Sequence, residues 1–167
     1  MKYDHVDRLL IQWEQQRPDL DPSSIGVIGR LCRINKIIEQ RLQHAFKKHD
    51  LSGIEFDILA TLRRNNRPIT PTELYQSVML TSGAMSTRIE HMVQRGLIGR
   101  IANEEDRRSC KVFLTPEGRT LIDKAVESHL ENQKAMLEPL TATQQEQLAT
   151  LLRHWLLDNE STSSDSP

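Results

Sequence analysis

Residues 69–119 read ITPTELYQSVMLTSGAMSTRIEHMVQRGLIGRIANEEDRRSCKVFLTPEGR, and this stretch decides the fold. The Thr-Pro-Thr-Glu sequence that begins at Thr70 can form a capping box with proline at the first helical position, so it predicts a short helix. The Thr-Ser pair ending at Ser82 can cap a second helix, which stops at Gly96. A charged hairpin follows at residues 97–114. This order predicts a winged helix-turn-helix, whose second helix enters the major groove of DNA.

The second helix has an apolar face and a polar face. At 100° per residue, four apolar side chains fall in one sector and are expected to enter the core: Met85, Ile89, Met92 and Val93. The opposite side carries Gly83, Thr87, Glu90, His91 and Gln94. Small polar residues such as Gly83, Ser86 and Thr87 let a helix approach phosphates and base edges closely. Arg88 lies at the boundary, so its side chain can reach sideways and back into the protein.

The net charge of −1 over 167 residues argues against a nucleic-acid partner, but its distribution argues for one. Residues 61–119 contain ten Lys or Arg and six Asp or Glu, a net charge of +4, and the remainder carries −5. Positive potential therefore gathers on the segment expected to contact DNA. The sequence has no apolar run of spanning length and no signal peptide, which predicts a cytoplasmic protein without a membrane partner. Cys32 and Cys110 lack metal-type spacing, as expected in a reducing compartment.

The helical patterns predict a mainly α protein with a small β-hairpin, divided into four parts. These are N-terminal helices for dimerisation and one wall of a ligand pocket at 1–50, the winged helix-turn-helix at 51–115, C-terminal dimerisation helices at 116–159 and a disordered tail at 160–167. The second part opens with another capping box, from Ser52 to Glu55.

Apolar stripes on the terminal helices need a partner. Helical spacing is followed near the N-terminus by Val6, Leu9, Leu10 and Trp13, and near the C-terminus by Leu148, Leu151, Leu152, Trp155 and Leu156. A compact winged domain offers these helices nothing obvious to pack on, so we expect a second copy to cover them. A two-fold homodimer would recognise a pseudo-palindromic operator in double-stranded DNA, with half-sites about 10 base pairs apart.

With these motifs the chain resembles the MarR-type transcriptional regulators over residues 25–157. The likeness is carried by the reading helix SGAMSTRIEHMVQRGLIGR, the wing EEDRRS and the segment VFLTPEGR. The resemblance implies a homodimeric repressor that is not an enzyme, and whose DNA binding is relieved by small phenolic or anionic ligands or by cysteine oxidation.

The same resemblance implies which residues contact DNA. In the major groove these would be Ser82, Ser86 and Thr87, with Gly83 and His91 on the same outer face. In the minor groove Arg108 would insert from the wing tip, beside Arg107 and with Asp106 pairing nearby. The family's wing pattern Asp-x-Arg-Asp-x-Arg is only half kept, since Asn103 and Glu105 replace its first acidic and basic residues, which implies weaker phosphate binding.

The segments QWE at 12–14, RPDLD at 17–21 and EFDILATLRR at 55–64 are similar to the PecS and urate-responsive branch of this family. The similarity implies an effector site made of Trp13, Asp57, Arg88 and Arg100. A planar purine anion such as urate suits an aromatic face and a guanidinium. In the free protein Asp57 would need a cation, for which Arg88 is the candidate, and an arriving anion would strain this pair and shift the reading helix.

Two other classes of protein fit the sequence less well. Cys32 lies in a Leu-Cys step, as the reactive cysteine does in the family's organic-peroxide sensors, so an oxidant sensor is the alternative. Its apolar stripe and the lack of a second cysteine nearby favour a buried, inert thiol. An enzyme is disfavoured because the sequence contains no nucleophile–base motif, phosphate loop or metal spacing, and no cofactor is expected.

Overall fold

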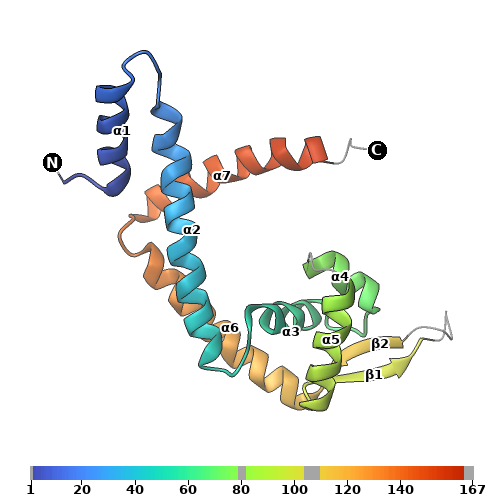
Figure 1. Ribbon diagram of the computed structural model, residues 1–167. Coiled ribbons are helices and arrows are strands. Elements are labelled where there is room, and N and C mark those ends of the chain that lie inside the picture. The colour runs from blue at the N-terminus through green and yellow to red at the C-terminus, as the bar shows by residue number, and fades with distance from the viewer. Residues whose placement is uncertain (1, 79–81, 104–109, 164–167) are drawn as a thin grey trace. The chain divides into compact units, whose positions relative to one another are not determined.

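The computed structural model describes residues 2–78, 82–103 and 110–163 and is mainly helical with one antiparallel hairpin, which confirms the predicted fold class (Figure 1). The elements are α1 (His5–Gln16), α2 (Ser23–Lys47), α3 (Gly53–Asn65), α4 (Pro71–Val78), α5 (Ser82–Gln94), β1 (Ile98–Ala102), β2 (Cys110–Leu114), α6 (Pro116–Leu137) and α7 (Ala142–Ser163). The chain divides into two units, residues 1–129 and residues 130–167, and the helix-turn-helix lies in the first.

The core of the first unit lies where α3, α4, α5 and the hairpin meet. Its buried side chains are Phe46, Leu51, Phe56, Ile58, Leu59, Ala60, Leu62, Ile69, Leu74, Met85, Ile89, Met92, Leu97, Ile98, Val112, Ile122 and Ala125. The set includes Met85, Ile89 and Met92 from the face of α5 that was predicted to be apolar, and Val93 packs against it partly buried. The predicted orientation of the reading helix is therefore confirmed.

Helix α1 packs on α2 within the same chain. This corrects the expectation that α1 finds no surface of its own chain to pack on. Val6 is 1% exposed, and its methyl groups lie 3.5 Å from the position that a Cβ would take at Gly29. Leu10 approaches Gly26 in the same way, at 3.8 Å. The two glycines let the helices approach closely. Trp13 remains largely exposed at the far end of α1.

Both predicted capping boxes of the DNA-binding unit are present. At the start of α3, the backbone N–H and hydroxyl of Ser52 donate to Glu55 at 2.8 Å each, and the Glu55 N–H donates to the Ser52 hydroxyl at 3.3 Å. At the start of α4, the Thr70 N–H donates to Glu73 at 2.7 Å, and Arg67 also binds Glu73, at 2.9 Å. These contacts stabilise the carboxylate form, so the Thr70 N–H first and Arg67 second lower the pKa of Glu73 from 4.5 to about 2.

This lowered pKa predicts a pH-dependent contribution to stability. The charged form of Glu73 is favoured by folding, so its stabilisation should be complete above pH 4.5 and should disappear as the pH falls towards 2. Glu73→Gln should lower the free energy of unfolding by about 1 kcal/mol at neutral pH, a value limited by solvent exposure of the ion pair. Urea titrations of both proteins from pH 7 to pH 2 should converge at the acidic end. A constant difference would show that charge on Glu73 is not the cause.

The hairpin is joined to the helices by a backbone bridge. Strands β1 and β2 pair antiparallel with Ile98 opposite Leu114, and Ile69, just before α4, bridges to Val112 in β2. Two hydrogen bonds make this bridge, from the Ile69 N–H to the Val112 carbonyl at 3.1 Å and from the Val112 N–H to the Ile69 carbonyl at 2.8 Å. The two-stranded hairpin is therefore fastened to the residue that leads into the helix-turn-helix.

Two positions at this junction require glycine, one for its backbone conformation and one for lack of space. Gly96 follows α5 with φ of +71°, the left-handed conformation expected after a helix, as predicted. Gly118 lies in the first turn of α6, where its N–H donates to the capping hydroxyl of Thr115 at 3.0 Å. A Cβ at Gly118 would lie 2.0 Å from the backbone carbonyl oxygen of Leu97. The TPEGR segment therefore needs glycine because β1 begins directly against it.

In the second unit, α7 begins with the predicted cap. The Thr141 N–H donates to the Gln144 side chain at 2.9 Å, and the Gln144 N–H donates to the Thr141 hydroxyl at 3.3 Å. Helix α7 continues to Ser163, into the segment that was expected to be a disordered tail. Its large apolar side chains are exposed in the single chain: Leu148, Leu151, Leu152, Trp155, Leu156 and Leu157.

Candidate nucleic-acid interface and adjoining cleft

The outer face of α5 presents part of the predicted DNA contact. Ser86 and Thr87 are exposed, while Met85 and Ile89 beside them are buried. Ser82 and Gly83 form the first turn of the same helix. The predicted wing residues Asp106, Arg107 and Arg108 lie outside the described residues. Arg100, at the base of the hairpin, pairs with Glu90 of α5 at 2.9 Å.

His91 has a partner inside the protein, which the sequence did not predict. Its Nδ1 lies 3.0 Å from Oε1 of Glu55, although the His91 side chain is still half exposed. A carboxylate only accepts hydrogen bonds, so Nδ1 carries the hydrogen in this contact. The orientation of the His91 ring is therefore set by Glu55 on α3.

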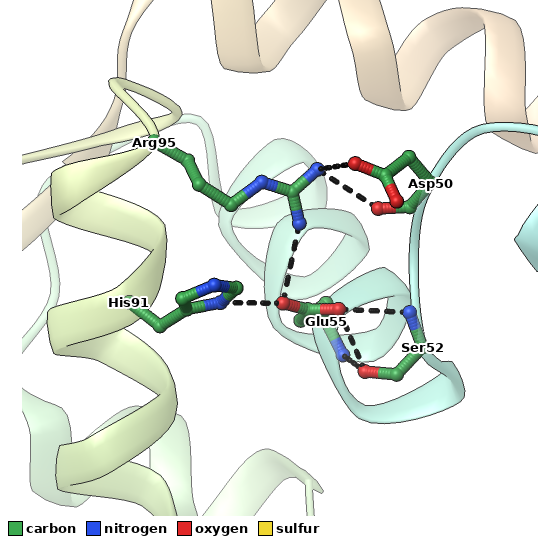
Figure 2. Close-up of polar contacts among 5 residues, drawn as sticks. All are labelled: Asp50, Ser52, Glu55, His91 and Arg95. Carbon is green, nitrogen blue, oxygen red and sulfur yellow. Dashed lines mark hydrogen bonds and ion pairs between the residues drawn. The ribbon is translucent and has the colours of Figure 1, made fainter.

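Glu55 is the centre of a polar cluster, which we call the Glu55 cluster and which comprises Asp50, Ser52, Glu55, His91 and Arg95. Figure 2 shows Arg95 and His91 reaching from α5 toward the corner between α2 and α3. Arg95 donates to Glu55 at 3.3 Å, to the Asp50 carbonyl at 2.8 Å and to the Asp50 carboxylate at 3.1 Å. The cluster therefore joins the reading helix to the helix that precedes the helix-turn-helix.

The carboxyl group of Glu55 is charged despite being only 4% exposed. Burial by itself raises its pKa, but the hydrogen bonds from Ser52 and His91 and the charge of Arg95 act in the opposite direction and prevail, so the pKa of Glu55 is lowered. Sequence reasoning identified Glu55 only as a capping residue. The available signal was the spacing of His91 and Arg95, four residues apart on one side of α5.

A cleft of about 610 Å³ lies beside the cluster, and we call it the Glu55 cleft. It is lined by Lys47, Asp50, Leu51, Ser52, Glu55, Arg88, His91 and Arg95. Arg88, predicted to reach back into the protein, does so here and is half-buried.

The predicted pair of Asp57 and Arg88 is wrong. Asp57 follows Glu55 by two residues, so it points to a different side of α3 from the one that meets Arg88. The titratable groups that interact electrostatically with Asp57 within the described part of the chain are Arg64 and His129. Apolar surroundings raise the pKa of Asp57, and those two groups oppose this effect.

The neighbourhood of Asp57 is aromatic. Phe46 stacks on Phe56 with ring centroids 4.4 Å apart, and the His129 ring lies 4.8 Å from that of Phe56. Burial lowers the pKa of His129, and the charge of Asp57 opposes this shift. Among the described residues, the buried Nδ1 of His129 has no hydrogen-bond partner, so a neutral ring suits this position.

Trp13 does not meet the other predicted effector residues within one chain. Leu10 packs near Gly26, so Trp13, one turn further along α1, lies near the start of α2, whereas Phe46, which stacks on Phe56 next to Asp57 in the chain, lies at the end of α2. Residues Gly26 and Phe46 are separated by about 30 Å of helix at 1.5 Å per residue. Arg100, in turn, is bound to Glu90.

Cys32 is exposed on α2 in the single chain, rather than buried as its apolar stripe suggested, and Cys110 is half-buried in β2. Neither forms a disulfide. Within the residues described, His, Cys, Asp and Glu side chains form no group of three suited to a metal ion. None of the helices there combines the length and apolar character required to cross a membrane.

Comparison with known proteins agrees with this architecture. The family model of the MarR family matches residues 49–109. The transcriptional regulator PecS of Dickeya dadantii is 39% identical over 153 residues, which cover 90% of this chain and 92% of PecS. The solved structure of wild-type MarR from E. coli without ligand has a TM-score of 0.68 and 25% identity, covering 77% of this chain and 96% of MarR.

Two further solved structures share the fold. A mutant MarR from E. coli complexed with operator DNA has a TM-score of 0.68 at 23% identity, over 86% of this chain and 97% of its own. Bordetella bronchiseptica BpsR, whose DNA binding is regulated by 6-hydroxynicotinic acid, has a TM-score of 0.67 at 21% identity, over 86% and 96%. Because the chain is 39% identical to PecS over nearly its whole length and contains the MarR family match, it belongs to the MarR family of DNA-binding transcriptional regulators.

Proposed function

We propose that this chain is a homodimeric repressor that binds a pseudo-palindromic operator in the cytoplasm and is released by a small anionic or aromatic effector, such as urate or a related purine. The observation that carries the proposal is the reading helix α5, whose apolar face is buried while Ser86 and Thr87 face outward. The positive charge of the surrounding segment and the identity to PecS support it.

The proposed DNA contacts fall into two groups. Ser82, Gly83, Ser86, Thr87 and His91 would read the major groove from α5, with the partial positive charge of the helix N-terminus facing the DNA. Asp106, Arg107 and Arg108 would approach the minor groove from the tip of the hairpin. The shared fold with the MarR–operator complex supports this docking.

The proposed dimer partner covers apolar surface that the single chain exposes. On α7 this surface includes Leu151 and Trp155, and on α2 it includes Val27, Ile34 and Ile37. Side chains of this size rarely stay exposed in one protein without a partner. In a dimer, Trp13 of one chain can approach effector residues of its partner. The proposed effector site of Trp13, Asp57, Arg88 and Arg100 would therefore combine residues from two subunits.

The function is tested by operator binding and its response to ligand. Light scattering should give a dimer at micromolar concentration, and the full-length protein should retard DNA from upstream of its own gene in a gel shift. Titrated urate should then release the DNA. A monomer, or a protein that binds this DNA no better than an unrelated sequence, would refute the proposal.

Substitutions on α5 and in the wing should have different kinds of effect on DNA binding. Thr87→Ala should reduce discrimination between operator and mismatched DNA by about 1–3 kcal/mol, because Thr87 is proposed to meet base edges. Arg108→Ala should weaken binding to all DNA and reduce the slope of log affinity against log salt by about 1. Fluorescence anisotropy on both sequences at several salt concentrations measures this. Equal effects of both substitutions on all sequences would refute the assignment of Thr87.

The exposure of Cys32 favours one alternative, an oxidant-sensing repressor. In that case peroxide treatment should oxidise the Cys32 thiol and release the operator, and Cys32→Ser should abolish the release. Mass spectrometry beside a gel shift distinguishes this alternative from effector binding.

A further inference from the structure

Glu90 lies on the face of α5 that is proposed to read DNA, yet it is absent from the proposed contacts. It follows Ser86 by four residues and Thr87 by three, so in a helix it lies within about 60° of both. All three side chains are exposed, while Ile89 beside them is buried. The three residues span about 6 Å of helix, which is less than two base-pair steps of about 3.4 Å each. Glu90 is therefore close enough to contact the same half-site.

The negative charge of Glu90 would be repelled by DNA phosphates if nothing offset it. The structure offsets it with Arg100 of β1, whose Nη1 lies 2.9 Å from Oε2 of Glu90. Gln94, one turn further along α5, donates from its side-chain amide to Oε1 of Glu90 at 3.4 Å. These contacts hold the carboxylate at the edge of α5 that borders the hairpin, while half of the Glu90 side chain remains open to solvent.

The hydrogen-bonding character of Glu90 limits which bases it can read. An ionised carboxylate accepts hydrogen bonds only, at about four sites on its two oxygens. Over the described ranges of the chain, Arg100 and Gln94 use two of them, so acceptor capacity remains for a donor from DNA. The major-groove edges of guanine and thymine present acceptors, and the amino group of adenine lies next to the acceptor N7. Cytosine presents its N4 amino group alone, so it is the base that suits a carboxylate.

We propose that Glu90 is a specificity-determining residue of this DNA-binding protein, that it selects a cytosine in each operator half-site by accepting a hydrogen bond from the N4 amino group, and that the ion pair with Arg100 positions it for that contact. The inference rests on the proposed function, because it uses the docking of α5 in the major groove. It adds Glu90 to the residues proposed to read bases.

Glu90 acts by rejection as well as by attraction. Another base at the same place sets an acceptor against the carboxylate, in a groove bordered by phosphates. Specificity of this kind penalises wrong sequences in addition to rewarding the right one. Removing the charge is therefore expected to tighten binding to unrelated DNA and to reduce the preference for the operator.

Two substitutions of the same shape and charge change provide a matched pair. Glu90→Gln keeps the size of the side chain but offers both a carbonyl oxygen and an amino group, so it can meet either a donor or an acceptor on a base. Glu117→Gln removes the same charge from an exposed residue in the first turn of α6. Arg100→Ala is the third variant. It leaves the charge of Glu90 unbalanced, so it should weaken binding to every sequence.

In vitro selection from a random duplex library, followed by sequencing, gives the base preference of each protein at every position. Wild type and Glu117→Gln should both select a cytosine at one position of each half-site where Glu90→Gln has no preference. Fluorescence anisotropy then compares the selected duplex with one in which that C·G pair is changed to T·A, which replaces the amino donor by an acceptor. The change should lower the affinity of wild type and Glu117→Gln by about tenfold or more, and that of Glu90→Gln by less than about twofold. Circular dichroism melting curves check that each variant is folded.

If Glu90→Gln selects the same bases as Glu117→Gln, Glu90 does not read DNA and the inference falls, while the proposed function stands. If Glu90→Gln weakens binding to all sequences as Arg100→Ala does, with its cytosine preference intact, Glu90 serves only to hold the hairpin. If the preference that Glu90→Gln loses is for another base, the assignment of cytosine is wrong. If wild type selects no sequence from the library, the proposed function itself fails.

Discussion

Glu55→Ala is expected to lower the free energy of unfolding by about 3 kcal/mol, since it leaves buried polar groups without their partner. Ser52 loses the acceptor of its N–H and hydroxyl, and Arg95 keeps only Asp50. The link between α3 and α5 is lost with them. We expect operator affinity to fall roughly tenfold, equivalent to about 1.4 kcal/mol of lost pre-organisation.

Glu73→Ala is the matched control for this variant. Glu73 has the same place in a capping box, but its other partner, Arg67, is nearby in sequence and exposed. Its loss should cost about 1 kcal/mol and leave α5 in place. Urea denaturation and operator anisotropy on both variants measure the difference. Equal losses would mean that the contacts of Glu55 with His91 and Arg95 do not anchor the reading helix.

Gly118→Ala should be at least as damaging, with a loss of about 3 kcal/mol and a melting temperature lower by roughly 10 °C. The added Cβ would lie 2.0 Å from the oxygen and 2.9 Å from the carbon of the Leu97 carbonyl. Because these atoms are backbone, no side-chain rotation relieves the overlap. The Thr115 N–H also donates to this carbonyl at 3.2 Å, so moving it breaks the entry to α6.

The same substitution at Gly26 provides the comparison. A Cβ there would meet only side-chain atoms, at 3.5 Å from Arg30 and 3.8 Å from Leu10. Alanine is the better helix former, so Gly26→Ala should be neutral or stabilise α2 by up to about 1 kcal/mol. Thermal unfolding followed by circular dichroism gives both values. Similar melting temperatures for the two variants would show that α6 can move away from β1.

Local signals in the sequence predicted the parts of this fold that are decided locally. A capping box such as Ser52 to Glu55 is complete within four residues, and helical periodicity places Met85 and Ile89 on one face regardless of what they pack on. Gly96 could be identified because a left-handed residue after a helix is a backbone requirement. The fold class followed from the order of these signals.

The candidate site was harder to predict because its contacts join distant segments. Glu55 and His91 are 36 positions apart, and Glu55 and Arg95 are 40 apart, so neither pair leaves a local pattern. Asp57 was favoured over Glu55 because of the resemblance, but the angle between successive helical residues directs Asp57 to another side of α3. The position of Arg88 at the boundary of a helix face was predicted correctly, but its predicted partner, Asp57, was wrong.

The packing of α1 depends on the spacing of two glycines in α2. Gly26 and Gly29 lie three residues apart on one face of α2, which creates a smooth surface for Val6 and Leu10. Small residues at this spacing allow close approach of a second helix. The apolar stripe of α1 was therefore divided between its own chain at Val6 and open surface at Trp13.

The bridge between Ile69 and Val112 has a consequence for how an operator half-site is released. These two hydrogen bonds fasten the return strand of the hairpin to the residue that leads into α4, so neither can rotate far without the other. Major-groove and minor-groove contacts should then be lost together, and a half-site should dissociate with one rate constant. Stopped-flow records of release are expected to fit one exponential, with no intermediate in which the wing has left the DNA and α5 remains.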